Sequence, residues 1–164
     1  SEGLRPGGSL LTVESDSRAA EVAQRYFWKN STSKQIDLVI GRGKDVLGEI
    51  QGSSDRVFNM AFIDADKRSC QEYLQLLMGE NGGRKMLADG ALVVIDNTLF
   101  KGLVLAEAQG KSCSASADSS PKSFRMRRLG KAMDEFNTFC ATHPHLSPVL
   151  IPLRDGLTLC RYHA

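Results

Sequence analysis

The sequence of 164 residues has no apolar run near the roughly 20 residues that a membrane-spanning helix needs, so no membrane partner is expected. It also lacks an excess of either charge, because 21 basic and 19 acidic residues give a formal net charge of +2. That value is too small to indicate binding to nucleic acid. The first residues show no signal-peptide pattern. The composition, 41% hydrophobic and 24% charged, is instead typical of a globular protein.

The cysteines lack the C-x-x-C spacing of zinc sites and lie in four different segments, at Cys70, Cys113, Cys140 and Cys160. Neither a zinc site nor a disulfide framework is indicated, so reduced thiols in a cytoplasmic location are the expectation. The length suits a single domain spanning residues 1–164. The chain begins with Ser1 rather than Met and soon reaches a turn at Pro6-Gly7, which suggests a segment of a longer protein.

Strand patterns alternate with helix patterns along the chain. We expect strands at Ser9–Val13, Ile36–Ile40, Val57–Ile63 and Ala91–Ile95, and helices at Ser17–Asn30, Asp45–Ile50, Cys70–Met78 and Phe124–Cys140. Asp16 or Ser17 is a plausible N-cap of the first helix. This alternation predicts a Rossmann-like, doubly wound α/β fold with a mostly parallel sheet.

Loops and the C-terminal end complete this pattern. Polar loops are expected at Gly52–Asp55 and Gly79–Lys85, and the Ser-rich stretch Gly110–Ser123 is interpreted as a mobile surface insertion. Near the C-terminus, Pro148–Leu153 and Leu157–Tyr162 flank an Asp-Gly turn, which is typical of a hairpin. The sheet should therefore end in an antiparallel edge.

Two of the expected strands end abruptly in oxygen donors. The segment FIDADK places Asp64 and Asp66 after one strand, and VVIDN places Asp96 and Asn97 after another. Ligands of open α/β sheets bind beyond the carboxyl ends of the strands. Carboxylate and amide oxygens there suit Mg²⁺, Ca²⁺ or Mn²⁺ better than Zn²⁺.

These residues also have simpler interpretations. In an extended segment Asp64 and Asp66 would face the same way and repel unless a cation lies between them; the alternative is that each caps the next helix. Lys67 is a candidate base or a surface lysine paired with Asp66. Glu14, at a strand end, is a candidate ribose ligand or a loop acid. Gly43, with Gly41, would allow close approach of a flat ring or merely form a turn.

Together these segments resemble the cation-dependent class I O-methyltransferases of the caffeoyl-CoA and catechol type. The matching pieces are LLTVES, IDLVIGRGKDVL, FIDADKRSCQEYL, ALVVIDNTLFKG and IPLRDGLTLCRY. The order of DADK, then DN-x-L-[aromatic]-K-G, then P-[LIV]-x-DG-[LI]-T-[LI] is specific, and the resemblance covers nearly the whole chain.

The resemblance implies a role for each candidate residue. The metal ligands fall on Asp64, Asp96 and Asn97, with Asp64 also on the cofactor side. The residues implied to bind S-adenosylmethionine are Glu14 at the ribose, Gly43 at the adenine and Asp66 at the methionine part. Lys67 matches the general base and Lys101 a substrate-contacting position. The implied reaction methylates a hydroxyl of a small catechol or hydroxycinnamoyl-type acceptor, with Mg²⁺ as the expected cation and a homodimer as the expected assembly.

The family's first strand and its glycine-rich loop would lie before Ser1. That strand is central in the family's order, next to the strands that end at Glu14 and Asp64, and without it two inner edges would be unpaired. We expect upstream residues to exist; another chain filling the gap and a non-catalytic remnant are the alternatives. An unrelated metal-dependent hydrolase is disfavoured because no nucleophile or water-activating histidine accompanies the acids.

Overall fold

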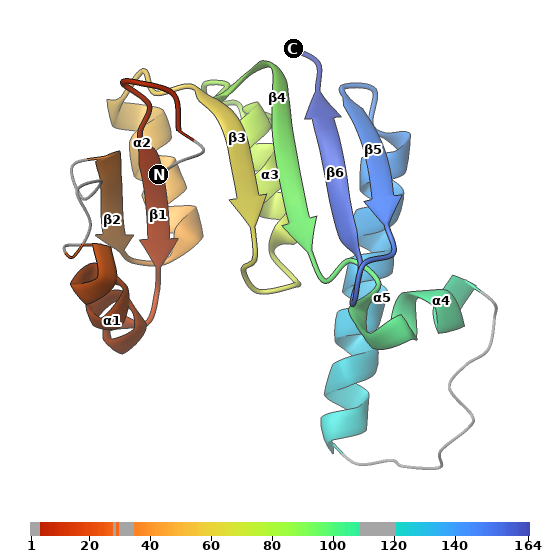
Figure 1. The fold of residues 1–164 in the computed structure, drawn as a ribbon. Helices are drawn as coiled ribbons and strands as arrows, with labels where there is room; N and C mark the ends of the chain where they lie inside the picture. Colours follow the sequence, from red (N-terminus) through yellow and green to blue (C-terminus); the bar gives the residue numbers. More distant parts are fainter. Residues whose placement is uncertain (1–3, 28, 30–34, 109–120) are drawn as a thin grey trace. The chain divides into compact units, whose positions relative to one another are not determined.

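The computed structural model describes residues 4–27, 29, 35–108 and 121–164. Contacts along the chain divide it into two compact units, Ser1–Ser54 and Asp55–Ala164. The described strands form two sheets, one of two strands in the first unit and one of four in the second (Figure 1). Each sheet is combined with helices that follow its strands, as expected of an α/β protein.

The first unit is a β-α-β-α segment. Its strands pair in parallel, with Leu10 opposite Ile36 and Glu14 opposite Ile40. Parallel strands need a crossover connection, which the first helix provides. Asp16 is the residue that caps this helix, because its Oδ1 accepts hydrogen bonds from the N–H groups of Arg18 and Ala19 at 2.8 and 3.3 Å. The elements are β1 (Leu10–Glu14), α1 (Ser17–Phe27), β2 (Ile36–Ile40) and α2 (Gly43–Ser53).

The second unit contains the sheet of order β3-β4-β6-β5. β3 and β4 are parallel, whereas β6 runs antiparallel to both of its neighbours. The predicted hairpin therefore forms the sheet edge, with β6 as its inner strand. The elements are β3 (Phe58–Ile63), α3 (Cys70–Met78), β4 (Leu87–Asp96), η2 (Phe100–Gly102), α4 (Leu103–Ala108), α5 (Pro121–Thr142), β5 (Leu146–Ile151) and β6 (Leu157–Tyr162).

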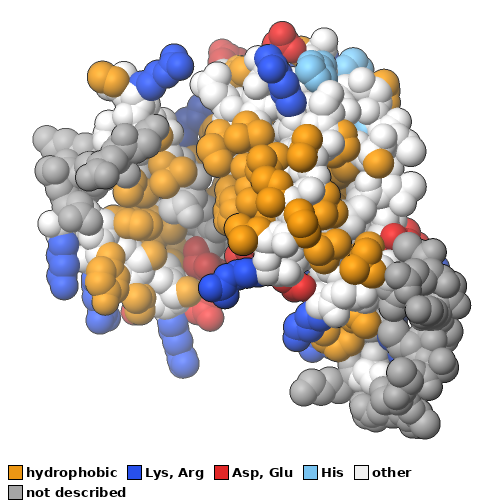
Figure 2. All heavy atoms as spheres, turned by 45° about the vertical axis from the view of Figure 1, so that its right-hand side comes forward, with side chains coloured by type: hydrophobic (Ala, Val, Ile, Leu, Met, Phe, Trp, Pro, Cys, Tyr) orange, Lys and Arg blue, Asp and Glu red, His pale blue; other side chains and the backbone are white. Residues whose placement is uncertain are grey.

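The core of the second unit lies between one face of this sheet and helices α3 and α5, which both lie behind the sheet in Figure 1. Its fully buried side chains include Leu74, Ile95, Met133, Phe136 and Tyr162. The opposite face remains apolar and exposed within this unit, as Figure 2 shows. The exposed side chains there include Met60, Phe62, Leu92 and Val149, which the strand register places on one face.

Three elements, α2, β4 and α5, are longer than the sequence pattern predicts, and α5 spans Pro121–Thr142 instead of Phe124–Cys140. α2 continues through Ser53, whose hydroxyl donates to the Glu49 carbonyl at 2.6 Å, so the loop expected from Gly52 begins later. β4 begins at Leu87 instead of Ala91 because Gly90, with φ +75°, lies at a shift in the strand register. Glycine permits such a bulge, although in a sequence it suggests the end of a strand.

The segment after Asn97 holds two helical elements, η2 and α4, that the sequence did not predict. Most of the Ser-rich stretch lies outside the described residues, but its last residues, from Pro121, belong to α5. α5 also packs closely on α4, because a Cβ on Gly130 would lie 2.7 Å from the Leu103 Cβ. In the described part of the chain no helix is long and apolar enough to cross a membrane.

Gly79 offers a test of the turn that ends α3. Both Gly79 and Gly82 have positive φ, yet a Cβ on Gly79 would lie 2.9 Å from the Gly83 carbonyl oxygen, whereas open space surrounds Gly82. We expect Gly82→Ala to lower the free energy of unfolding by about 1–2 kcal/mol through backbone strain. Gly79→Ala should lower it by an additional ~1–3 kcal/mol. Urea unfolding of both variants measures this, and equal losses would contradict the steric argument.

Candidate active site

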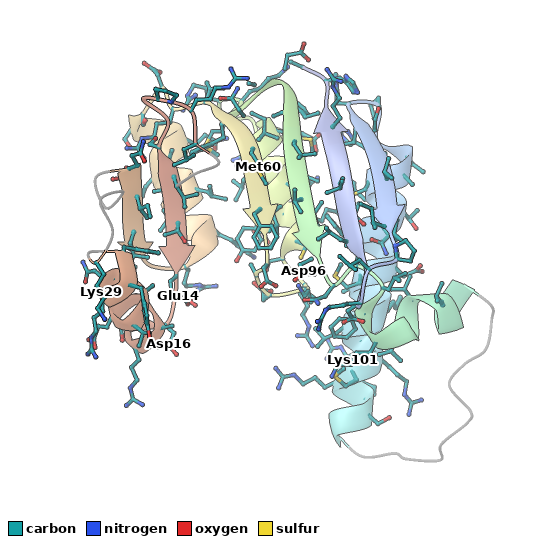
Figure 3. The ribbon with its side chains drawn as sticks, in the orientation of Figure 1. Glu14, Asp16, Lys29, Met60, Asp96 and Lys101 are labelled. Carbon is teal, nitrogen blue, oxygen red and sulfur yellow. The ribbon has the colours of Figure 1, made fainter. Side chains whose placement is uncertain are left out.

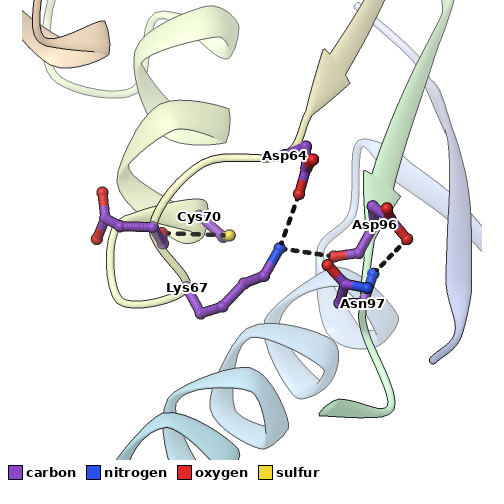
Figure 4. A network of polar contacts seen from close by, with 6 residues as sticks. Asp64, Lys67, Cys70, Asp96 and Asn97 are labelled. Carbon is purple, nitrogen blue, oxygen red and sulfur yellow. Dashed lines mark hydrogen bonds and ion pairs between the residues drawn. The ribbon is translucent and has the colours of Figure 1, made fainter. Parts of the chain in front are cut away.

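The two strand-end motifs meet at the same edge of the second sheet. Because β3 and β4 are parallel with Ile63 opposite Ile95, the residues that follow emerge together. Figure 4 shows Asp64, Asp96 and Asn97 around the end of the Lys67 side chain. The structure thus brings the three predicted metal ligands and the predicted base into one group, and Asp96 and the predicted substrate residue Lys101 also lie toward this end of the sheet (Figure 3).

Lys67 joins the two motifs through its ammonium group. Its Nζ donates to the Asp96 carbonyl oxygen at 3.0 Å and to the Asp64 Oδ1 at 3.4 Å. The Lys67 side chain is only 12% exposed, whereas that of Asp64 is 53% exposed. Lys67 is therefore not the surface lysine paired with Asp66 that the simpler interpretation suggested.

The hydrogen-bond partners of Asp66 differ from those of Asp64. Its carboxylate accepts hydrogen bonds from the Ser69 N–H and the Tyr73 hydroxyl, both at 3.2 Å. These bonds hold the carboxylate next to the start of α3, whose N-cap residue is Ser69. The expectation that Asp64 and Asp66 point the same way is wrong, because the chain turns after Asp64 instead of continuing as a strand.

The environment of Tyr73, which includes the Asp66 carboxylate, changes the pKa of its hydroxyl. Burial of the ring, the Asp66 charge and the hydrogen bond to its carboxylate raise the pKa of Tyr73 to about 12. Burial also raises the pKa of the neighbouring Cys70 thiol to about 11. Both groups therefore stay protonated at neutral pH, and Tyr73 acts as a hydrogen-bond donor to Asp66. The sequence pattern placed Tyr73 only within the helix expected at Cys70–Met78.

The thiols in the described part of the chain are free and buried, at Cys70, Cys140 and Cys160. A hydrogen bond with Cys160 and burial raise the pKa of the Cys140 thiol. Cys113 lies outside the described residues, and the expectation of reduced thiols stays a prediction.

The backbone after β4 is strained. Asn97, Phe100 and Lys101 have φ values of 60°, 41° and 56°. For a residue with a Cβ, the left-handed region costs about 1–2 kcal/mol, and Asn is among the few types that tolerate it well. Such strain persists only where surrounding contacts hold it, and it is frequent at functional sites.

Thr98 anchors this strained segment to the core. It is fully buried, its hydroxyl accepts a hydrogen bond from the Thr158 hydroxyl at 2.9 Å, and its carbonyl accepts one from the Asn137 Nδ2 at 2.8 Å. Asn97 itself donates its N–H to the Asp96 Oδ1 at 2.7 Å. The backbone of Asn97 is thus held by contacts on both sides of the residue.

The other predicted cofactor residues lie in the first unit. The Gly41 N–H donates to the Glu14 carbonyl at 2.9 Å, so the ends of β1 and β2 are adjacent and Gly43 begins α2 at the same edge. The Glu14 Oε1 accepts from the Asp16 N–H at 2.8 Å, and Figure 3 shows both side chains beyond the end of β1. The structure brings Glu14 and Gly43 to one edge, which fits either a ligand site or a capped turn.

The donor set in the second unit fits a hard cation by its chemistry. Asp64 and Asp96 supply carboxylate oxygens and Asn97 an amide oxygen, the ligand types of Mg²⁺ and Ca²⁺. No group of three or more His, Cys, Asp or Glu side chains suited to a metal occurs among the described residues. A cation here would therefore depend on the Asn97 amide.

Comparison with known proteins identifies the family. The family model described as O-methyltransferase matches residues 1–163, so the chain belongs to the O-methyltransferase family, as the resemblance indicated. It is 28% identical to caffeoyl-CoA O-methyltransferase of Populus kitakamiensis over 159 residues, which is 96% of this chain and 61% of that protein. It is 33% identical to catechol O-methyltransferase of Niastella koreensis over 104 residues, which is 63% of this chain and 44% of that protein.

Solved structures confirm the fold class. The O-methyltransferase from Bacillus cereus in complex with SAH superposes with a TM-score of 0.77 at 21% sequence identity, covering 98% of this chain and 65% of that one. A likeness at this identity shows the Rossmann-like fold. The chain spans about three-fifths of the length of the first curated relatives that it matches.

The pKa of Tyr73 predicts a loss of stability at alkaline pH. An unfolded tyrosine loses its proton near pH 10, whereas folded Tyr73 keeps it to about pH 12. Between these values the unfolded state binds fewer protons, so the free energy of unfolding falls as the pH rises, and the full contribution is present below pH 10.

Urea unfolding from pH 9 to pH 12 measures this effect. Tyr73→Phe should flatten the fall in the free energy of unfolding relative to the wild type. Tyr26→Phe, at an exposed tyrosine, is the matched control and should leave the slope unchanged. An identical slope for Tyr73→Phe would contradict the assignment.

Proposed function

We propose that this chain forms part of an S-adenosylmethionine- and divalent-cation-dependent O-methyltransferase that methylates a hydroxyl of a small catechol or hydroxycinnamoyl-type acceptor. The observation that supports this most directly is the position of Lys67 Nζ, between the Asp64 carboxylate and the Asp96 carbonyl. In this proposal the largely covered Lys67 amine, which lies among oxygen atoms of the proposed ligand set, would serve as the proton acceptor beside the cation site.

In this proposal Asp64, Asp96 and Asn97 would hold the cation, with Mg²⁺ the first choice and Ca²⁺ or Mn²⁺ as alternatives. A bound divalent cation supplies positive charge that stabilises the phenolate form of the acceptor, since a phenol with pKa near ~10 is a poor nucleophile at neutral pH. The exposed half of the Asp64 side chain leaves that carboxylate accessible from solvent.

Lys67 would act on the proton of the acceptor hydroxyl. Nζ would accept this proton, and the Asp96 carbonyl and the Asp64 carboxylate would stabilise the ammonium form through the observed hydrogen bonds. S-adenosylmethionine, when bound, would supply the methyl group to this oxygen, and the electron pair of the broken carbon–sulfur bond would stay on sulfur. The protein's part in this step is mainly to hold the reacting oxygen in line with the methyl group.

The remaining assignments follow the predicted roles. Glu14 would accept hydrogen bonds from the ribose hydroxyls of S-adenosylmethionine, and Gly43 would lie along its adenine. Asp66, already bonded to Ser69 and Tyr73, would act near the methionine part through its position in the loop. The exposed Lys101 would contact the acceptor. A cytoplasmic homodimer is the proposed setting.

A second candidate is a non-catalytic protein that keeps the fold without binding the cofactor. The observation in its favour is strand pairing: β1 pairs only with β2 and β3 only with β4 among the described strands. Glu14 thus ends a strand of one sheet, and Asp64 follows a strand of another. Cofactor binding discriminates between the two candidates.

Asp96→Ala tests the cation site. We expect it to lower Mg²⁺-stimulated methyl transfer to a catechol acceptor by at least about 100-fold, or roughly 3 kcal/mol, because a ligand is lost while the fold persists. Asp89→Ala removes the same charge from the opposite end of β4 and is the matched control. Activity that persists in the presence of a strong chelator would refute the role of the metal.

Calorimetric titration with S-adenosylmethionine tests the cofactor site. A version that extends upstream to the length of the relatives should bind, and Glu14→Gln in that version should weaken binding about 10- to 100-fold, because a charged hydrogen-bond acceptor is lost. Glu21→Gln, on the exposed surface of α1, should bind as the wild type does. If neither the 164-residue chain nor the extended version binds S-adenosylmethionine, the proposed enzyme function is rejected in favour of the non-catalytic candidate.

A further inference from the structure

The strained segment after β4 is held by a turn more than fifty residues away in the sequence. The Asp155 carboxylate Oδ1 accepts the Lys101 N–H, across a separation of 54 residues. The Asp155 carbonyl accepts the Leu99 N–H at 2.8 Å, and the Gly156 carbonyl accepts the Thr98 N–H at 3.1 Å. The turn between β5 and β6 thus accepts hydrogen bonds from the backbone N–H groups of Thr98, Leu99 and Lys101.

Close packing fixes the turn against this segment. Gly156 has φ +84°, and a Cβ on it would lie 2.7 Å from the Leu99 backbone nitrogen and 2.6 Å from the Leu99 Cγ. The register of β4 with β6 sets the approach, because Asp96 is opposite Leu157. The turn therefore lies beside the end of β4 as a direct consequence of strand pairing.

Among these contacts, the Asp155 carboxylate is the one supplied by a side chain. It bonds the N–H of Lys101, a residue with φ 56°, in a conformation that a residue with a Cβ adopts only when held there. Charge-assisted hydrogen bonds to a backbone N–H are stronger than neutral ones. Loss of this bond should let the backbone at Lys101 relax and should alter the direction of Asn97 at the other end of the segment.

We propose that Asp155 is a positioning residue, which holds the segment Asn97–Lys101 so that the Asn97 amide oxygen is directed to the cation site. This inference rests on the proposed function, because it requires that Asn97 be a cation ligand. Asp155 acts through the backbone and touches neither the acceptor nor the cation. Partners of metal ligands commonly change metal affinity 10- to 100-fold when they are removed.

The experiment measures Mn²⁺ binding by electron paramagnetic resonance, without cofactor or acceptor, together with amide hydrogen exchange. Asp155→Ala should weaken Mn²⁺ binding about 10-fold and speed exchange of the Lys101 amide by a similar factor. Asp155→Asn keeps an acceptor oxygen and should restore both values to within about threefold of the wild type. Asp89→Ala, which also removes a carboxylate that accepts a backbone N–H, from Ala164, should change neither.

A suppressor variant separates positioning from general destabilisation. Because glycine adopts positive φ readily, Lys101→Gly in the Asp155→Ala background should regain at least about threefold in Mn²⁺ affinity. If Asp155→Ala does not fold, Asp155→Asn and this double variant still provide the comparison.

The outcomes distinguish the two proposals. Wild-type protein that does not bind Mn²⁺ would reject the cation site and this inference with it. Wild-type binding, with unchanged Mn²⁺ affinity in Asp155→Ala, would leave the proposed function standing and overturn the role of Asp155. An equal loss of affinity in Asp155→Ala, Asp155→Asn and the double variant would also overturn it, because the loss would then not follow the hydrogen bond.

Discussion

The parallel pairing of β3 with β4 is the constraint on which the candidate site depends. With Ile63 opposite Ile95, the next residues of both strands leave the sheet side by side. A shift of one residue would turn Asp96 toward the other face, because side chains alternate along a strand. Lys67 then links the two strand ends, since its Nζ contacts an oxygen of each motif. The strand register therefore decides which side chains meet at the candidate site.

The sequence predicted this edge well because its signals are local. Ile36–Ile40 and Cys70–Met78 have the predicted bounds, since each is a clear periodic run that ends at glycine or polar residues. The grouping of Asp64, Lys67, Asp96 and Asn97 followed from the rule that parallel strands end at the same sheet edge. The family resemblance was confirmed by the family model, whereas the individual roles of these residues stay predictions.

The sequence did not reveal features that depend on specific contacts between residues. Gly90 suggested a strand end, but pairing with β3 carries β4 through a bulge. Asp66 was expected beside Asp64, yet the Tyr73 hydroxyl and the Ser69 N–H hold it at the start of α3. The positive φ values of Phe100 and Lys101 have no signal in their residue types. Each outcome depends on a specific contact between residues, which a periodicity argument does not include.

The turn of the C-terminal hairpin has two structural roles. Its Asp-Gly turn was predicted because glycine permits a tight reversal, and it does close the β5–β6 edge. The same turn also accepts backbone N–H groups from the segment after Asn97, and its glycine leaves the space that Leu99 occupies. Any residue with a Cβ at Gly156 would both strain the turn and push Leu99 away. The segment that follows β4 is therefore linked physically to the turn that joins the last two strands of the sheet.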